Sequence, residues 1–216
     1  MTVQSDSGPE VEQLIAAAGD AARRGWIPAT SGNFSVRIGE RIAITRSGCD
    51  KSALRVQDMA QLALDDALPA GVSAEAPLHL ARYRADAAIG AILHVHAGSA
   101  ALVSRLSVAR GHLLLHGWEL LKAFSGIGSH DVTLRVPVFA NAQDTAALAR
   151  QIETELASAH ATRLAPGYLL AGHGLYAWGR DVAEARRHLE AFDALLTLQW
   201  QFDHQTLNSV SGDYVA

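Results

Sequence analysis

The stretch AILHVHAGSA, residues 91–100, places two histidines one residue apart within an apolar segment. Its hydrophobic residues predict a buried strand over 89–96, followed by a helix that runs through Leu106. Because side chains alternate between the two faces of a strand, His94 and His96 point the same way and can reach one metal ion. A chain with ten histidines also produces such a pair by chance. The pair alone therefore leaves two interpretations open, a metal site and a pair of hydrogen-bonded core histidines.

A third histidine favours the metal. His173 follows an apolar segment and lies between Gly172 and Gly174, where the backbone can present a side chain from the edge of a sheet. Three imidazoles that leave a coordination position open are typical of a catalytic metal site. With a single cysteine in the chain, the ligands favour zinc or another borderline divalent ion. The remaining histidines show no such pattern and are interpreted as surface or hydrogen-bonded groups: His79, His112, His116, His130, His160, His188 and His204.

Composition limits the classes of protein to which the chain can belong. A chain of 216 residues is expected to form a single domain, 1–216, with polar tails at about 1–9 and 203–216. The net charge of −4 and the absence of a lysine or arginine cluster argue against a nucleic-acid partner. We expect neither a signal peptide nor a membrane span, because the N-terminal residues are polar and acidic and no apolar segment approaches the ~18 residues that a span needs. With Cys49 as its only cysteine, we expect a soluble, cytoplasmic protein without membrane partners.

Helical and strand-like segments are mixed along the whole chain. Helical spacing of apolar residues predicts helices, whereas alternation or short apolar runs between turn residues predict strands. Helices are expected over 10–24, 74–84, 97–106, 117–124, 142–159 and 181–200. Strands are expected over 34–38, 41–45, 59–64, 89–96, 132–139, 167–171 and 175–178, with the first two joined as a hairpin. This order indicates an α/β sandwich with a mixed sheet.

Prolines and polar residues refine three of these elements. Pro77 is tolerated only in the first turn of a helix, so we expect Ser73 to cap the helix that follows. Pro137 lacks a backbone donor and therefore favours an edge position for its strand. The segment after Phe202 is polar, and we expect it to lie beyond the last helix as a frayed tail.

Two glutamates have both a structural and a chemical interpretation. Glu75 lies in the first turn of its predicted helix, where the helix dipole stabilises a carboxylate. Near a metal, a carboxylate in that position could also transfer a proton to or from carbon. Glu119 could form an exposed ion pair with Lys122, three residues further on. The residues by themselves favour the structural interpretation of both glutamates.

Two turns are rich in glycine and hydroxyl groups, 30–33 and 45–48. Turns of this kind expose backbone N–H groups that can bind a phosphate, and Arg46 or Lys51 could add positive charge. As isolated turns they are explained better as simple connections between strands.

Five ordered motifs together resemble the class II aldolase family. They are Ser31-Gly32-Asn33, Thr45-Arg46-Ser47-Gly48, Ser73-Ala74-Glu75, His94-Val95-His96 and Ala171-Gly172-His173-Gly174. The resemblance extends from about Ala17 to Phe192 and implies a three-layer α/β/α sandwich with a mixed, largely antiparallel central sheet. It also implies one zinc ion per subunit bound by His94, His96 and His173, Glu75 as an acid/base, and a homotetramer with sites near subunit interfaces. The residues that it assigns to the substrate phosphate are Ser31, Gly32, Asn33, Thr45, Ser47, Gly48 and Ser73.

Further segments resemble one branch of this family, the methylthioribulose-1-phosphate dehydratases. They are ATSGNFSVR, ITRSGCDK, LHVHAGSAALVSRL, LHGWELLKAF and VPVFANAQDTAALA. This resemblance implies a zinc-dependent hydro-lyase of methionine salvage that acts on a sugar phosphate, with Glu119 as the acid/base, which we rank ahead of Glu75. A sugar-phosphate aldolase or epimerase is the alternative, and a non-catalytic structural module of the same fold is a third. Cys49 stands where this branch more often has a basic residue, which leaves open the cation on the phosphate side.

Overall fold

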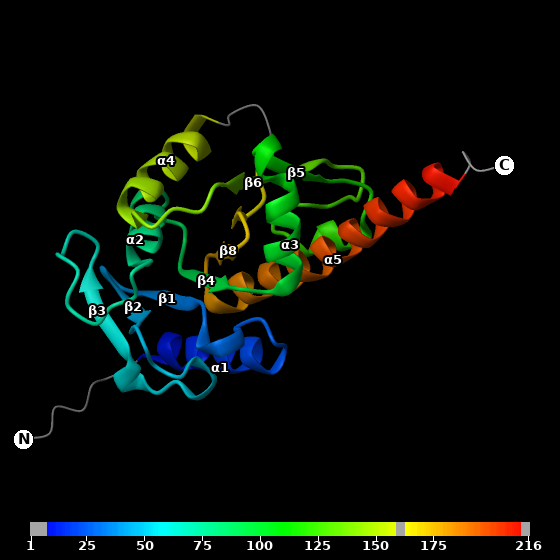
Figure 1. Cartoon of the computed structure of the whole chain (residues 1–216). Helices are drawn as coiled ribbons and strands as arrows, with labels where there is room; N and C mark the ends of the chain where they lie inside the picture. The colour runs from blue at the N-terminus through cyan, green and yellow to red at the C-terminus, as the bar shows by residue number, and fades with distance from the viewer. Residues whose placement is uncertain (1–7, 159–162, 213–216) are drawn as a thin grey trace, which may run out of the picture.

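An eight-stranded sheet forms the centre of the computed structural model, which describes residues 8–158 and 163–212, with side chains up to residue 205 (Figure 1). Its strand order is β3-β2-β1-β4-β8-β7-β6-β5. The strands are β1 (Asn33–Ile38), β2 (Arg41–Thr45), β3 (Met59–Ala63), β4 (Ala91–Val95), β5 (His112–Leu115), β6 (Leu134–Phe139), β7 (Gly167–Leu170) and β8 (Gly174–Gly179). Neighbouring strands are antiparallel except β6 and β7, so the sheet is mixed and largely antiparallel, as predicted.

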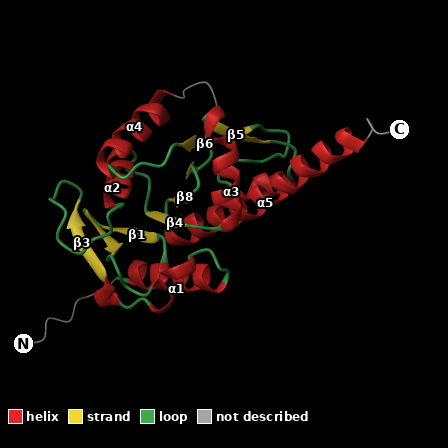
Figure 2. Cartoon of the chain, in the orientation of Figure 1, coloured by secondary structure: helices red, strands yellow, loops and turns green. Residues whose placement is uncertain are grey.

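Helices cover both faces of this sheet. In the described residues the α-helices are α1 (Pro9–Arg23), α2 (Ala76–Ala85), α3 (Gly98–Ser107), α4 (Thr145–Ser158) and α5 (Val182–Gly212). Helices α1, α3 and α5 contribute buried side chains to one hydrophobic core, whereas α2 and α4 contribute to a second core. In Figures 1 and 2, α2 and α4 lie together on one side of the strands, and α1 and α5 lie on the other. The two cores confirm the predicted three-layer α/β/α sandwich. No helix in the described part of the chain is both long and apolar enough to cross a membrane.

Strand β4 shows how alternation sorts side chains between the two cores. Leu93 and Val95 belong to the core of α1, α3 and α5, whereas Ile92 belongs to the core of α2 and α4. All five residues of β4 are buried, because the strand lies between β1 and β8. His94 shares the face of Ile92 and stacks on Tyr176 of β8, with ring centroids 3.9 Å apart. The apolar segment that contains the first histidine is therefore a central strand covered on both faces.

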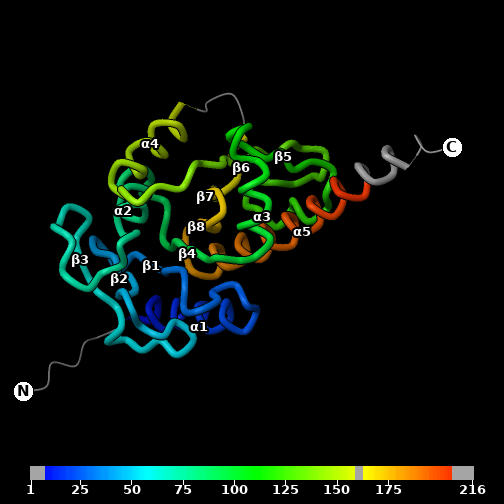
Figure 3. The backbone as a smooth tube through the Cα atoms, viewed as in Figure 1, coloured from blue at the N-terminus to red at the C-terminus, as the bar shows by residue number. Residues whose placement is uncertain are grey.

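The edge position predicted for the strand that contains Pro137 is wrong. Strand β6 lies inside the sheet, between β7 and the edge strand β5, a four-residue strand that was not predicted (Figure 3). The Val138 amide donates to the Gly111 carbonyl, so the nitrogen of Pro137 faces away from β5. The parallel pairing with β7 begins at Val138, opposite Leu169. Pro137 precedes that pairing, so its missing N–H costs no hydrogen bond in it.

The prediction that the last helix ends near Trp200 is wrong. Helix α5 continues through the first part of the predicted polar tail to Gly212. Contacts one turn apart extend it, because Gln199 donates to Asp203 at 2.9 Å and Trp200 stacks on His204. The final residues 213–216, and residues 1–7 of the predicted N-terminal tail, lie outside the described residues.

Helix α2 begins two residues later than predicted. Its N-cap is Glu75 and not Ser73, and Pro77 lies in the first turn as expected. The Ser73 hydroxyl accepts a hydrogen bond from the Glu75 amide at 3.3 Å, so it supports the turn into the helix. The Glu75 side chain makes no capping bond, which leaves its carboxylate available for contacts with the sheet.

A buried histidine of α2 lies against the sheet. His79 has no exposed surface, and its ring nitrogens lie 2.7 Å from the Ser35 hydroxyl and 2.5 Å from the Asn33 amide oxygen. It is therefore a hydrogen-bonded core histidine, one of the two kinds expected for the histidines outside the metal site. Burial, only partly opposed by the charge of Glu75, lowers the pKa of His79 to about 4. The imidazole is neutral at physiological pH.

The two glycines that flank β1 predict different losses of stability when each is replaced by alanine. Gly32 has a φ of +78°, and a Cβ atom there would collide with the backbone carbonyl of His94. Gly39 in the β1–β2 turn has a φ of +55° but open space around it. Gly32→Ala should therefore lower the free energy of unfolding by ~2 kcal/mol or more, and the matched control Gly39→Ala by only ~1 kcal/mol. Urea denaturation measures both, and equal losses would contradict the close approach of β1 and β4.

The buried imidazole predicts a loss of stability in mild acid. Because the folded pKa of about 4 lies below the ordinary value of 6.5, the unfolded chain takes up this proton first as the pH falls. The contribution of His79 is complete above pH 6.5 and is lost as the pH falls towards 4, by about 3 kcal/mol in all. Urea unfolding of metal-free protein should show a shallower pH slope for His79→Gln than for the wild type in this window. Parallel slopes would refute the buried neutral state.

Candidate metal centre

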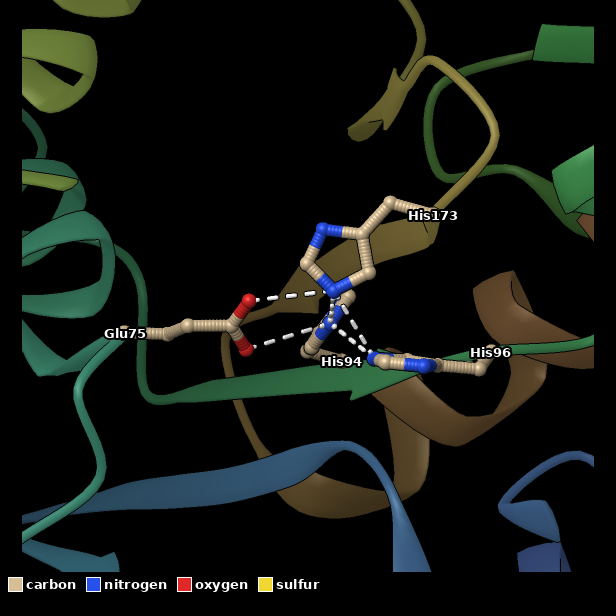
Figure 4. Close-up of side chains that lie close together, drawn as sticks. All are labelled: Glu75, His94, His96 and His173. Atoms are coloured by element: carbon tan, nitrogen blue, oxygen red, sulfur yellow. Dashed lines mark hydrogen bonds and ion pairs between the residues drawn. The ribbon is translucent and has the colours of Figure 1, made fainter. Parts of the chain in front are cut away.

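Three imidazoles converge on one point at the centre of the sheet. His94 lies in β4, His96 directly follows that strand, and His173 lies in the turn between β7 and β8 (Figure 4). The Nε2 atom of His94 is 3.0 Å from that of His96 and 3.4 Å from that of His173, and the remaining pair is 2.9 Å apart. The structure thus brings together the three histidines that were predicted to bind a metal.

Strand pairing accounts for this convergence. Strand β4 pairs with β8 so that Val95 lies opposite Leu175, which places the turn with His173 beside the end of β4. The His96 amide donates to the Trp26 carbonyl at 2.8 Å, and this bond orients the chain where it leaves the strand. A Cβ atom at Gly174 would collide with the Val95 carbonyl. Glycine is therefore needed beside His173 for the two strands to approach this closely.

The hydrogen bonds of two imidazoles turn their Nε2 lone pairs towards each other. The Nδ1 atom of His94 lies 3.0 Å from the Leu175 carbonyl oxygen, which can only accept a hydrogen bond. The Nδ1 atom of His173 lies 3.3 Å from the Asn141 amide oxygen. His94 therefore carries its proton on Nδ1 and presents a lone pair from Nε2, and His173 does the same when its Nδ1 atom donates to Asn141. Lone pairs that face one another at these distances repel unless a cation lies between them, so this donor set fits a metal ion.

The Glu75 carboxylate completes the cluster. Its Oε1 atom lies 3.1 Å from Nε2 of His173, and its Oε2 atom lies 3.3 Å from Nε2 of His94 (Figure 4). One ligand atom from each of the four residues lies within 4.8 Å of all the others. Burial by itself would raise the pKa of Glu75, but His173 and His94, when they carry a proton, and the hydrogen bond from Asn33 outweigh it and lower the pKa well below its ordinary value. Three histidines and one carboxylate can hold a divalent metal ion.

Burial keeps two of the histidine ligands neutral. It holds the pKa of His94 well below its ordinary value. Burial and the charge of His173 lower the pKa of His96 to about 4. A metal binds the unprotonated imidazole, so the environment that disfavours the imidazolium favours metal binding. The electrostatics of the cluster therefore agree with its geometry.

The three segments predicted to bind phosphate, 31–33, 45–48 and Ser73, lie side by side. The Phe34 amide, which follows the first segment, donates to the Thr45 hydroxyl at 3.1 Å. The Ser47 amide donates to the carbonyl of Gly71 at 2.9 Å, close to Ser73. These bonds join turns that are distant in the sequence. The roles of these residues in phosphate binding stay predictions.

Three features of this region exceed what a simple strand connection requires. Ala29 and Thr30 have φ angles of 52° and 58°, which strain a residue with a side chain. The Ser31 hydroxyl oxygen is buried and has no hydrogen-bond partner among the described residues. The Lys51 side chain is buried and donates to the Thr30 carbonyl at 2.8 Å, whereas Arg46 is exposed. A strained turn, an unpaired hydroxyl and a buried ammonium group suit an anion site.

Glu119 lies outside the histidine cluster. It begins a short 3-10 helix (Glu119–Ala123), and its side chain is 70% exposed. Its carboxylate lies 2.5 Å from the Lys122 ammonium and 3.5 Å from Nδ1 of His130. The hydrogen bond from Lys122 lowers the pKa of Glu119. Within one chain the structure brings Glu75 to the histidines and does not bring Glu119 there, so the catalytic role of Glu119 stays a prediction.

Two residues that contact the ligands were not predicted. Asn141, which bonds His173, follows β6 by two residues, and an amide just beyond a strand end is a weak signal for a site. Tyr176 stacks on His94 from β8. Alternation along β8 predicts on which face of the sheet Tyr176 lies. It does not predict that β8 pairs with β4, which places Tyr176 opposite His94.

Known proteins resemble this chain in both sequence and structure. Residues 12–200 match the family described as Class II Aldolase and Adducin N-terminal domain. A methylthioribulose-1-phosphate dehydratase of Bradyrhizobium sp. is 52% identical over 191 residues, which cover 87% of this chain and 88% of the relative. Another, of Parvibaculum lavamentivorans, is 46% identical over 200 residues, 92% of this chain and 97% of the relative. An L-fuculose-1-phosphate aldolase of Thermus thermophilus has the same fold, with a TM-score of 0.72 at 24% identity over 92% of this chain and 95% of that one. With its fold, its histidine cluster and these likenesses in agreement, the chain belongs to the Class II Aldolase and Adducin N-terminal domain family.

Proposed function

We propose that the chain is a metal-dependent hydro-lyase that converts 5-methylthioribulose 1-phosphate to 2,3-diketo-5-methylthiopentyl 1-phosphate and water, in methionine salvage. The observation that carries this proposal is the converging three-histidine cluster. It occurs in a chain whose relatives, named methylthioribulose-1-phosphate dehydratase, are up to 52% identical over most of its length. An intact set of metal ligands argues for an enzyme and against a structural module.

Zinc is the metal that we propose, one ion per subunit. Neutral imidazole nitrogens with one carboxylate are a ligand set that zinc prefers. His94, His96 and His173 would hold the ion, and Glu75 lies where a fourth ligand would bind. When bound, the ion would act as a Lewis acid that polarises the substrate carbonyl.

The reaction requires an acid/base residue for two proton transfers. The proton on C3 is removed, and the C4 hydroxyl leaves as water after it gains a proton. The enol that results becomes the diketone when a proton moves from the C3 hydroxyl to C4. We assign this acid/base role first to Glu119, whose carboxylate is 70% exposed and pairs with Lys122, so that it is ionised and can accept a proton. Glu75 is the second candidate, because its carboxylate faces the histidines.

The substrate phosphate is proposed to bind the three adjoining turns, at Ser31, Gly32, Asn33, Thr45, Ser47, Gly48 and Ser73. The unpaired Ser31 hydroxyl supports this assignment. Lys51 would supply the positive charge that Cys49 does not, since its ammonium group is buried beside the strained turn. A sugar phosphate is therefore the partner that the site suits, with its anionic end at the turns and its carbonyl at the histidines.

We further infer a homotetramer in the cytoplasm. The Leu102 and Leu106 side chains of α3 are 42% and 61% exposed, and Leu114 of β5 is 47% exposed. Exposed apolar side chains on two neighbouring elements support association between subunits. The only cysteine, Cys49, donates its thiol hydrogen to the Arg46 carbonyl and has no partner for an internal disulfide, which supports a reducing compartment.

The proposed reaction predicts a metal-dependent dehydration. Purified protein should contain about one divalent ion per chain, and removal of the ion with a chelator should abolish turnover that zinc then restores. The assay compares 5-methylthioribulose 1-phosphate with fuculose 1-phosphate and ribulose phosphates. We expect a diketone from the thio sugar and no cleavage of the others. Release of a triose phosphate would instead identify an aldolase, and protein that never retains a metal would refute an enzyme of either kind.

If Glu119 is the acid/base residue, its replacement should lower turnover without changing metal binding. Glu119→Gln should lower kcat by about 10²–10⁴-fold, because an amide cannot transfer the proton, while the zinc content stays that of the wild type. Glu155→Gln in α4 is the control, since Glu155 is also exposed and lies in a helix of the second hydrophobic core, away from the short helix of Glu119. Wild-type turnover in Glu119→Gln, with a large loss in Glu75→Gln, would transfer the role to Glu75.

A further inference from the structure

A chain of buried hydrogen bonds leads from the core to the Glu75 carboxylate. The Asn33 Nδ2 atom donates to Glu75 Oε2 at 2.5 Å, the same oxygen that lies 3.3 Å from Nε2 of His94. On its other side, Asn33 Oδ1 lies 2.5 Å from Nε2 of His79. His79 Nδ1 lies 2.7 Å from the Ser35 hydroxyl, which lies 3.0 Å from that of Tyr83. Apart from the carboxylate, every member of this chain is buried.

Each bond in this chain has one possible direction. A carboxylate accepts, so Asn33 must turn its N–H towards Glu75 and its carbonyl oxygen towards His79. The imidazole must then donate from Nε2, which leaves a lone pair on Nδ1 to accept the Ser35 hydroxyl hydrogen. The Ser35 oxygen is left to accept from the Tyr83 hydroxyl. Every hydrogen therefore points towards Glu75.

The direction of the chain decides how Glu75 is held. With its proton on Nδ1, His79 would accept from Asn33, and the amide oxygen of Asn33 would then face a carboxylate oxygen and repel it. The acceptor-only carboxylate excludes this arrangement, and the Ser35 hydroxyl supports the other one by donating to the free Nδ1 atom. The tautomer of a core histidine thus sets the orientation of an amide, and that amide sets the position of the carboxylate.

We propose that His79, acting through Asn33, is a positioning residue of the metal centre that holds the Glu75 carboxylate against His94 and His173. This inference rests on the proposed metal dependence of the site and adds to it a residue of α2 that has no exposed surface. It also gives both polar ends of the Asn33 side chain a partner within the protein, so Asn33 would meet a substrate through its backbone.

The tests must separate positioning from simple packing, since the loss of any buried side chain destabilises the protein. His79→Leu removes the donor to Asn33, whereas His79→Gln keeps an N–H donor in the place of Nε2. Ser35→Ala leaves the imidazole in place and removes only the hydroxyl that donates to its Nδ1 atom. Leu148→Ala in α4 is the control, because Leu148 lies in the hydrophobic core of α2 and α4 but has no part in the chain of bonds.

Cobalt binding measures the position of the carboxylate without relying on turnover. We expect His79→Leu to weaken the affinity of metal-free protein for Co²⁺ by about tenfold and to change the visible absorption of the bound ion. His79→Gln should stay within about threefold of the wild type, and Ser35→Ala should fall between them. Leu148→Ala should lower thermal stability with unchanged affinity and spectrum. Crystal structures of the metal-free His79 variants should show the Glu75 carboxylate displaced in His79→Leu and retained in His79→Gln.

Two outcomes would overturn the proposal. One is a wild-type cobalt affinity and spectrum in both folded His79→Leu and Ser35→Ala, and the other is an equal change in Leu148→Ala. If His79→Leu does not fold, Ser35→Ala and His79→Gln decide alone. A wild-type protein that binds cobalt in a His79-dependent way but dehydrates no substrate would refute the proposed function and leave this inference intact.

Discussion

The repulsion between imidazole lone pairs at the centre of the sheet is the constraint on which the rest of the structure depends. Two Nε2 atoms are fixed as acceptors by the bonds that the Nδ1 atoms of His94 and His173 make to Leu175 and Asn141. Burial keeps His94 and His96 from taking up protons that would relieve this repulsion. A cation between the nitrogen atoms would relieve this repulsion, so the fold builds a site of defined charge and shape for one. The close strand approaches at Gly32 and Gly174 make this convergence possible, because a Cβ atom at either position would collide with a backbone carbonyl of His94 or Val95.

The two glutamates differ in what their surroundings allow. Glu75 is held from both sides, by the histidines and by Asn33, so its carboxylate has little freedom to change position. Glu119 lies on an exposed segment, and its partners Lys122 and His130 are exposed as well. That segment is nevertheless anchored, since Arg187 of α5 donates to the Ala123 carbonyl at 3.0 Å. A rigid carboxylate suits ligand binding and charge balance, whereas a carboxylate that can move and exchange protons with solvent suits acid/base work.

A polar chain in an apolar core is stable only when every member has a partner. Tyr83, Ser35, His79 and Asn33 meet this condition through bonds that all run in one direction. The loss of one member would leave a buried group unpaired, at a cost of about 1–3 kcal/mol. Because each side chain in this series is held by the one before it, the orientation of the Asn33 amide depends on buried core residues. Core packing and the metal site are therefore coupled in this part of the molecule.

Features that depend on local sequence pattern could be predicted, whereas those that depend on tertiary pairing could not. The sequence by itself determined most strands and helices, the shared face of His94 and His96, and the hairpin, because alternation and turn residues are local properties. It could not show that β5 would cover β6, or that contacts one turn apart would carry α5 beyond Phe202. It suggested Glu75 and Glu119 as candidates without a way to place either. Only the tertiary structure decided that Glu75 faces the histidines, that Asn141 and His79 support them, and that Lys51 is the buried cation. The physical reason is that these contacts join residues from different elements, and the pairing of β4 with β1 and β8 sets their distances.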